Sequence, residues 1–158
     1  MKILFLGLAS SFTPGMYYQE NLLVDQTLAD GHQVTYFSNP ERFENGVIRE
    51  TGEEDSYLQN GLHLVRFPYV GFSPIKKKIR LFRGVKKEIE KLNPDIIFCH
   101  NTQYFPILDA ASFKRKNPNV RLYADTHTAA YNSGKNWPQD DKPGTSQTVM
   151  TTQAQARR

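Results

Sequence analysis

The sequence has little of what stabilises small secreted scaffolds or anchors a chain in a membrane. Cys99 is the only cysteine among 158 residues, so no internal disulfide can form and a reducing compartment is expected. Its place in an apolar run predicts a small buried side chain rather than a reactive thiol. No apolar run reaches the roughly 18 to 20 residues that a membrane-spanning helix needs. We therefore expect one domain stabilised by its own hydrophobic core, without a transmembrane segment.

Motifs for several kinds of chemistry are also missing. Residues 7–10 read Gly-Leu-Ala-Ser, which is not the glycine fingerprint of a dinucleotide fold, and there is no glycine–lysine loop of the Walker type. No group of histidine, cysteine and carboxylate residues has the spacing of metal ligands, and no serine lies in a nucleophile elbow. These absences predict neither a metal nor a cofactor.

The N-terminus has few of the features of a secretory signal peptide. Its charged region is the single residue Lys2 and its apolar run is short, whereas a signal needs a basic region, a longer apolar region and a cleavage site. A strand–loop–helix–strand pattern also follows without interruption. We therefore expect a cytoplasmic protein.

What the sequence does contain is a β-α-β unit over its first 37 residues. A continuous apolar run predicts a buried strand over 2–8, and apolar spacing predicts a helix over 16–30, followed by a strand over 33–37. The loop between the first strand and the helix meets a helix N-terminus, where unpaired N–H groups favour anions. The candidate ligand contacts in this loop are Ser11, Pro14 and Gly15.

The remainder of the chain continues the alternation of strands and helices. An acidic segment without a hydrophobic period, residues 39–60, is expected to be a long surface loop. Apolar runs and helical spacing then predict three further strands and two helices, over residues 62–67, 96–99, 120–124, 75–92 and 106–116. The predicted fold is therefore α/β, a Rossmann-like open parallel sheet flanked by helices.

Polar side chains follow the last two expected strands directly. His100 and Asn101 come after the fourth strand, and Asp125 and His127 come after the fifth. Ligands bind at the carboxyl ends of parallel strands, so these side chains should meet the loop that follows the first strand. A histidine there can donate to a phosphate or a sugar hydroxyl, and Asp125 can bind a hydroxyl or orient an imidazole. Spacing alone assigns no acid, base or nucleophile.

Two further histidines, His32 and His63, lie at strand entrances. They belong to the opposite edge of the sheet and are expected to be structural.

The basic charge of the chain is concentrated in the helix expected over 75–92. This segment carries +6 and the remainder −2, which together give the net charge of +4. A basic amphipathic helix can dock on anionic lipid, where each Lys or Arg near the surface contributes about 1 kcal/mol before salt screening. A core-packed helix with a solvated lysine face is the alternative, and no motif accompanies the charge that would indicate nucleic acid. The candidate membrane contacts are Lys76, Lys77, Lys78, Arg80 and Arg83.

The order and spacing of several short motifs resemble a known family. The motifs are Lys2-Ile3-Leu4-Phe5, Pro14-Gly15 after the first strand, Gly31-His32-Gln33-Val34, Pro94-Asp95-Ile96-Ile97 leading to His100, and Asp125-Thr126-His127. With these motifs, residues 1–137 resemble the N-terminal domain of a retaining GT-B glycosyltransferase of the large family-four type.

The resemblance implies an enzyme that transfers a sugar from a nucleotide-sugar donor to a sugar or lipid-linked acceptor with retained configuration, usually without a metal. In such an enzyme the N-terminal domain mainly binds the acceptor. By position, Gly15 would belong to the loop near the donor phosphates, and His127 would contact the transferred sugar. Asp125 joins His127 as a candidate catalytic residue, and His100 matches the second histidine of the family's frequent His-x-His strand end. Many members act at the cytoplasmic membrane face.

The sequence also departs from the family pattern. Pro14 replaces the first residue of the usual Gly-Gly, Tyr17 stands where a glutamate is common, and Phe98 replaces the first histidine of His-x-His. A C-terminal domain with the paired glutamates that hold the donor is not part of the sequence, so we expect this chain to be incomplete and inactive alone. Residues 138–158 are polar and are expected to form a disordered tail unrelated to the domain.

Two other interpretations stay open at this point. The chain could be an acceptor- or partner-binding module that works with a separately encoded donor-binding domain. It could also be an unrelated flavodoxin-like binding domain, which the shared α/β pattern supports.

Overall fold

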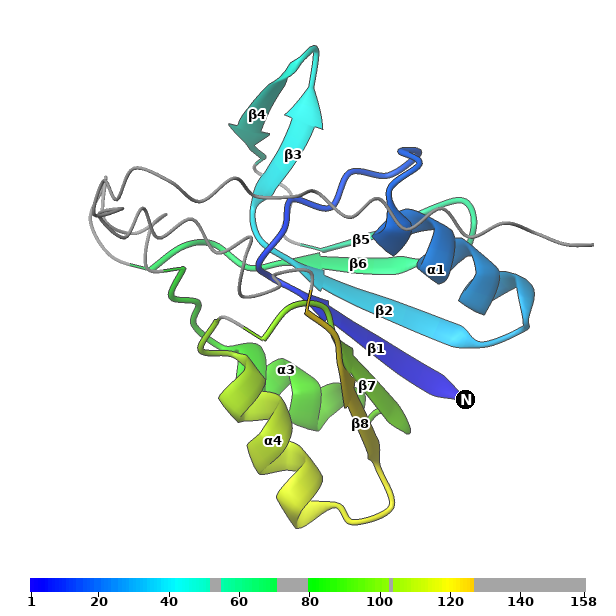
Figure 1. Ribbon diagram of the computed structural model, residues 1–158, viewed down its shortest axis with the longest axis vertical. Helices are drawn as coiled ribbons and strands as arrows, with labels where there is room; N and C mark the ends of the chain where they lie inside the picture. The colour runs from blue at the N-terminus through cyan, green and yellow to red at the C-terminus, as the bar shows by residue number, and fades with distance from the viewer. Residues whose placement is uncertain (52–54, 71–79, 103, 127–158) are drawn as a thin grey trace, which may run out of the picture. The chain divides into compact units, whose positions relative to one another are not determined.

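The computed structural model describes residues 1–51, 55–70, 80–102 and 104–126, and the account below concerns these residues. Their main sheet has the strand order β5-β6-β2-β1-β7-β8, in which β5 is antiparallel to β6 and all other neighbours are parallel (Figure 1). The strands are β1 Lys2–Gly7, β2 Gln33–Ser38, β5 Asp55–Tyr57, β6 His63–Arg66, β7 Ile96–Cys99 and β8 Arg121–Ala124. The Rossmann-like parallel sheet predicted from the sequence is confirmed.

Helices cover both faces of this sheet. On one face, Leu4 and Leu6 of β1 belong to a buried cluster with residues of α3 (Val85–Leu92) and α4 (Ile107–Lys116). On the other face, Ile3 and Phe5 pack with Val24 of α1 (Gln19–Ala29). Alternate side chains of a strand point to opposite faces, so β1 contributes side chains to two hydrophobic cores. This alternation also explains the continuous apolar run at the start of the chain.

The segment expected to be a long loop contains a hairpin. Strands β3 (Glu41–Glu44) and β4 (Val47–Glu50) pair in antiparallel fashion and project from the carboxyl edge of the sheet (Figure 1). Asn45 and Gly46, between them, both have positive φ, 50° and 83°, which is the requirement of a type I′ turn. The expectation of a loop over 39–60 is therefore wrong for this part, because the Asn-Gly dipeptide overrides the lack of a hydrophobic period.

The basic helix expected over 75–92 is shorter than predicted. Helix α3 begins at Val85, and Gly84 at its N-cap has a φ of 89°. Arg80 also has a positive φ, 52°, and Phe82 forms an isolated bridge with Tyr69. Residues 80–84 are therefore not helical, and the glycine rather than the apolar spacing sets the start of the helix. Residues 71–79 lie outside the described part of the chain.

Cys99 is fully buried in the core shared with α3 and α4. Its burial raises the pKa of the thiol to about 12, so the reactive thiolate is scarce near neutral pH. The prediction of a small buried side chain is confirmed. In the described ranges, no helix has both the length and the apolar character that crossing a membrane requires.

Gly7 ends β1 beneath the ring of Tyr36 on β2. A Cβ atom at Gly7 would lie 1.9 Å from the Tyr36 hydroxyl oxygen and 2.4 Å from ring carbon Cζ. Tyr36 is fully buried, so the ring has no solvent into which it could move. The first βα loop therefore depends on a residue without a side chain at position 7.

We predict that Gly7→Ala lowers the free energy of unfolding by about 1–3 kcal/mol, because the added methyl group overpacks this contact. Urea denaturation of the purified chain measures the loss. The same substitution in a Tyr36→Leu background, which lacks the ring, should be less damaging. An equal loss in both backgrounds would show that the ring does not impose the glycine.

Candidate functional site

The strand order brings three chain segments together at the carboxyl edge of the sheet. Strand β1 lies between β2 and β7. The chain continues from β1 to β2 on one side of β1 and later forms β7 on the other side. The place where the strand order reverses in this way is the topological switch point, where ligands bind in such sheets. The His100 amide donates to the Leu6 carbonyl at 3.0 Å, and the Asp125 amide donates to the Cys99 carbonyl at 3.1 Å. These bonds extend the ladders past the strand ends and place His100 and Asp125 beside the first loop.

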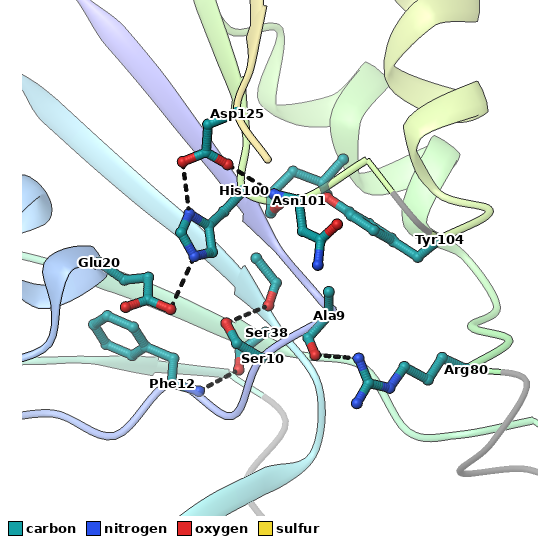
Figure 2. A network of polar contacts seen from close by, with 12 residues as sticks. Ala9, Ser10, Phe12, Glu20, Ser38, Arg80, His100, Asn101, Tyr104 and Asp125 are labelled. Carbon is teal, nitrogen blue, oxygen red and sulfur yellow. Dashed lines mark hydrogen bonds and ion pairs between the residues drawn. The ribbon is translucent and has the colours of Figure 1, made fainter. Parts of the chain in front are cut away.

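His100 is held between two carboxylates (Figure 2). Its Nδ1 lies 3.1 Å from Asp125 Oδ2 and its Nε2 lies 2.9 Å from Glu20 Oε1, with 9% of the histidine side chain exposed. Carboxylate oxygens only accept hydrogen bonds when ionised. Both contacts are therefore hydrogen bonds at the same time when the imidazole is doubly protonated and positively charged. The three residues join the first turn of α1 to the ends of β7 and β8.

Asp125 also fixes the chain next to the histidine. Its Oδ1 accepts a hydrogen bond from the Asn101 amide at 2.9 Å. Asn101 has a φ of 75°, a left-handed conformation that asparagine adopts more readily than most residues. This geometry confirms that His100, Asn101 and Asp125 come together, as the order of the strands predicts.

A pocket of about 300 Å³ opens beside the histidine. Its lining combines the first loop, the start of α1 and the end of β7, namely Ala9, Ser10, Gln19, Glu20, His100 and Asn101. Of the residues selected from the sequence, His100 and Asn101 line this pocket and Asp125 supports them.

The other residues selected from the first loop lie away from this lining. The Ser11 hydroxyl is hydrogen-bonded to Glu41 Oε2 at 3.2 Å, toward the hairpin. Pro14 and Gly15 are exposed, and Gly15 has a φ of 78°. Their assignment to a ligand remains a prediction. His127, the second candidate catalytic residue, lies outside the described residues.

Two of the five candidate membrane contacts, Arg80 and Arg83, are described, and both are exposed. The guanidinium group of Arg80 donates a hydrogen bond to the Ala9 carbonyl, so it lies over the first loop (Figure 2). Lys76, Lys77 and Lys78 lie outside the described residues. The structure therefore associates Arg80 with the rim of the pocket.

The remaining histidines lie at the opposite edge, as predicted. His63 Nε2 is 2.6 Å from Asp55 Oδ1, and the His63 ring stacks on Tyr57 with 4.3 Å between ring centroids. His32 and His63 line a separate hollow of about 500 Å³. In the described ranges, no group of three or more His, Cys, Asp or Glu residues is arranged to hold a metal ion.

Sequence reasoning missed Glu20. A glutamate in the first turn of a helix is a common stabilising feature, and no local pattern distinguishes Glu20 from that ordinary role. Its contact with His100 depends on how α1 packs against the sheet. The sequence holds no signal for this contact apart from the position of Glu20 near the expected ligand loop.

Arg66 was also missed, although it organises the loops around the site. It is 3% exposed and ends β6, where Nη2 donates to the Phe12 carbonyl at 2.9 Å and Nη1 to the Glu41 carbonyl at 2.9 Å and the Asn39 carbonyl at 3.2 Å. One cation thus joins the first loop to the start of the hairpin. The available signal was the strand alternation, which places Arg66 on the same side as the buried Leu64.

A buried tyrosine is hydrogen-bonded to the end of β1. The Tyr104 hydroxyl donates to the Leu6 carbonyl at 2.5 Å, and burial raises the pKa of Tyr104 above its ordinary range. Tyr104 therefore stays a neutral donor and fixes the end of β1 (Figure 2).

The fold and this pocket define a Rossmann-like domain with a polar pocket at the switch point of its sheet. Comparison with known proteins makes the assignment specific. The family model for Glycosyltransferase Family 4 matches residues 22–150, and the chain belongs to this family. No curated protein matches the chain.

We predict that Arg66→Met lowers the free energy of unfolding by about 3 kcal/mol or more, because buried carbonyl groups lose a charged donor. Urea denaturation measures the loss. Arg121→Met provides the matched control, since Arg121 is exposed on the edge strand β8, and surface substitutions usually change stability by less than about 0.5 kcal/mol. A change of similar size in the two variants would contradict the role given to Arg66.

Proposed function

We propose that this chain forms the acceptor-side part of a GT-B glycosyltransferase, which transfers a sugar from a nucleotide-sugar donor to a sugar or lipid-linked acceptor with retention. The observation that carries the proposal is the polar pocket at the switch point of the sheet, in a domain of Glycosyltransferase Family 4. The pocket combines carboxylate, imidazole, amide and hydroxyl groups, which suit the hydroxyl groups of a sugar.

The donor diphosphate would require contacts beyond this pocket. The ionisable side chains in the pocket lining are Glu20 and His100, which pair with each other. The ionised carboxylate of Glu20, in the first turn of α1, repels a second anion at that point. We propose that a separate donor-binding domain supplies the cationic contacts, and that the chain alone does not transfer sugar.

We expect the chain alone to release no nucleoside diphosphate from a panel of nucleotide sugars above the enzyme-free rate. When a donor-binding domain of the same family completes the cleft in trans, release should begin, should depend on an acceptor and should give a product with the donor's anomeric configuration. Coupled detection of nucleoside diphosphate and NMR of the product measure both properties.

Calorimetric titration of the chain with the same nucleotide sugars provides the control. Submillimolar affinity for a nucleotide sugar would contradict the proposal that the donor contacts lie elsewhere. Product of inverted configuration would contradict retention.

Contact with an anionic membrane surface is a further part of the proposal. Helices α3 and α4 pack against each other and both carry basic side chains. These are Lys86, Lys87 and Lys91 on α3 and Lys114, Arg115 and Lys116 on α4, of which Lys91 pairs with Glu88 and Lys116 with Glu90. Basic side chains of this kind attract anionic lipid at low salt.

We predict that the chain sediments with vesicles that contain anionic lipid at low ionic strength and is released by added salt, because screening weakens surface attraction. Vesicles of zwitterionic lipid alone serve as the control. Absence of sedimentation with the anionic vesicles at low salt would contradict membrane contact.

A further inference from the structure

Both ring nitrogens of His100 are occupied within the protein. Nδ1 faces Asp125 at 3.1 Å and Nε2 faces Glu20 at 2.9 Å. A ligand could hydrogen-bond to either nitrogen only by displacing a carboxylate that already contacts it, and a hydrogen bond to a carboxylate is stronger than one between neutral groups. The histidine is therefore a poor candidate for the group that contacts the ligand directly.

Glu20 is better placed to contact a ligand. It lines the pocket, and 20% of its side chain is exposed. One of its oxygens, Oε1, binds His100, and a carboxylate offers about four acceptor positions over its two oxygens. Since an ionised carboxylate accepts and does not donate, the group that it receives must be a hydrogen-bond donor, such as a sugar hydroxyl.

The charges around the pocket also select the class of ligand. Glu20 and Asp125 bring two carboxylates to the single imidazole of His100. The guanidinium group of Arg80, at the rim of the pocket, donates to the Ala9 carbonyl. The other polar side chains of the lining, Ser10, Gln19 and Asn101, are neutral. A neutral polyol meets donors and acceptors here, whereas a phosphate placed beside Glu20 meets the like charge of its carboxylate.

We propose that Glu20 is the residue that receives a hydroxyl group of a neutral sugar in this pocket, and that His100 and Asp125 are positioning residues that act through it. The inference rests on the proposed function, because it names the class of ligand for the same site. His100 holds the Glu20 carboxylate in one orientation, and Asp125 holds the imidazole ring. Gly15 belongs to the same first loop as Ala9 and Ser10 but is not part of the lining of this pocket.

The test is an NMR titration of the ¹⁵N-labelled chain with two kinds of probe. The neutral probes are the methyl α-glycosides of glucose, mannose and galactose, and the anionic probes are inorganic phosphate and glucose 1-phosphate. We expect a neutral glycoside to shift the amide signals of Ser10, Gln19, Glu20 and Asn101, and the phosphates to leave them in place.

The Glu20→Gln variant keeps the size of the side chain and removes its charge. We expect it to weaken binding of the neutral glycoside about tenfold or more, because a hydrogen bond to a charged group is lost, and to strengthen binding of phosphate. A fold defect cannot produce these opposite changes. The matched control is Glu88→Gln on α3, whose carboxylate pairs with Lys91 at 3.3 Å away from the pocket, and it should bind as the unmodified chain does.

The Glu20→Asp variant tests the role of the charge separately, and it should retain the preference for the neutral probe with reduced affinity. Equal glycoside affinity of Glu20→Gln and the unmodified chain would overturn the inference, as would tighter binding of phosphate than of any glycoside by the unmodified chain. Absence of glycoside binding to the unmodified chain would also overturn it. The proposed transfer reaction fails by a different result, namely no nucleoside diphosphate release in the completed cleft.

Discussion

The contact of one histidine with two carboxylates is the interaction on which the carboxyl edge of this domain depends. Glu20 comes from a helix on one face of the sheet, His100 from the end of a central strand and Asp125 from the end of the neighbouring strand. Each element is placed by its own hydrophobic packing, and the polar contact then fixes how their ends meet. The shape of the pocket follows from this contact, because Glu20 and His100 form part of its wall.

A buried arginine organises the loops that surround this edge. Arg66 replaces the water that would otherwise satisfy the carbonyl groups of Phe12, Asn39 and Glu41, which are costly to bury without donors. It thereby ties the loop after β1 to the hairpin formed by β3 and β4. The loops that border the site are thus held by a side chain that lies outside the lining of the pocket.

The fold was predictable from the sequence where neighbouring residues form a clear apolar pattern. The apolar runs of β1 and β7 identified buried parallel strands, and the rule for such sheets brought His100, Asn101 and Asp125 together. The prediction failed at two places where turn-forming residues decide the local structure. Gly84 is the N-cap of a helix that the apolar spacing placed ten residues earlier. Asn45-Gly46 forms the turn of a hairpin in a segment that was expected to be a loop. The contacts of Glu20 and Arg66 were not predicted, because their partners lie far away in sequence and are brought close only by tertiary packing.

The most direct test of this account is a double-mutant cycle between Glu20 and Asp125, which do not need to touch each other to be coupled through His100. Urea denaturation would give the free energy of unfolding for Glu20→Gln, Asp125→Asn and the double variant. The account predicts that the double variant loses less stability than the sum of the single losses, because both carboxylates contact the one imidazole ring of His100 and either substitution already weakens the link between them. Additive losses, within about 0.3 kcal/mol, would show that the two carboxylates act independently and would contradict it.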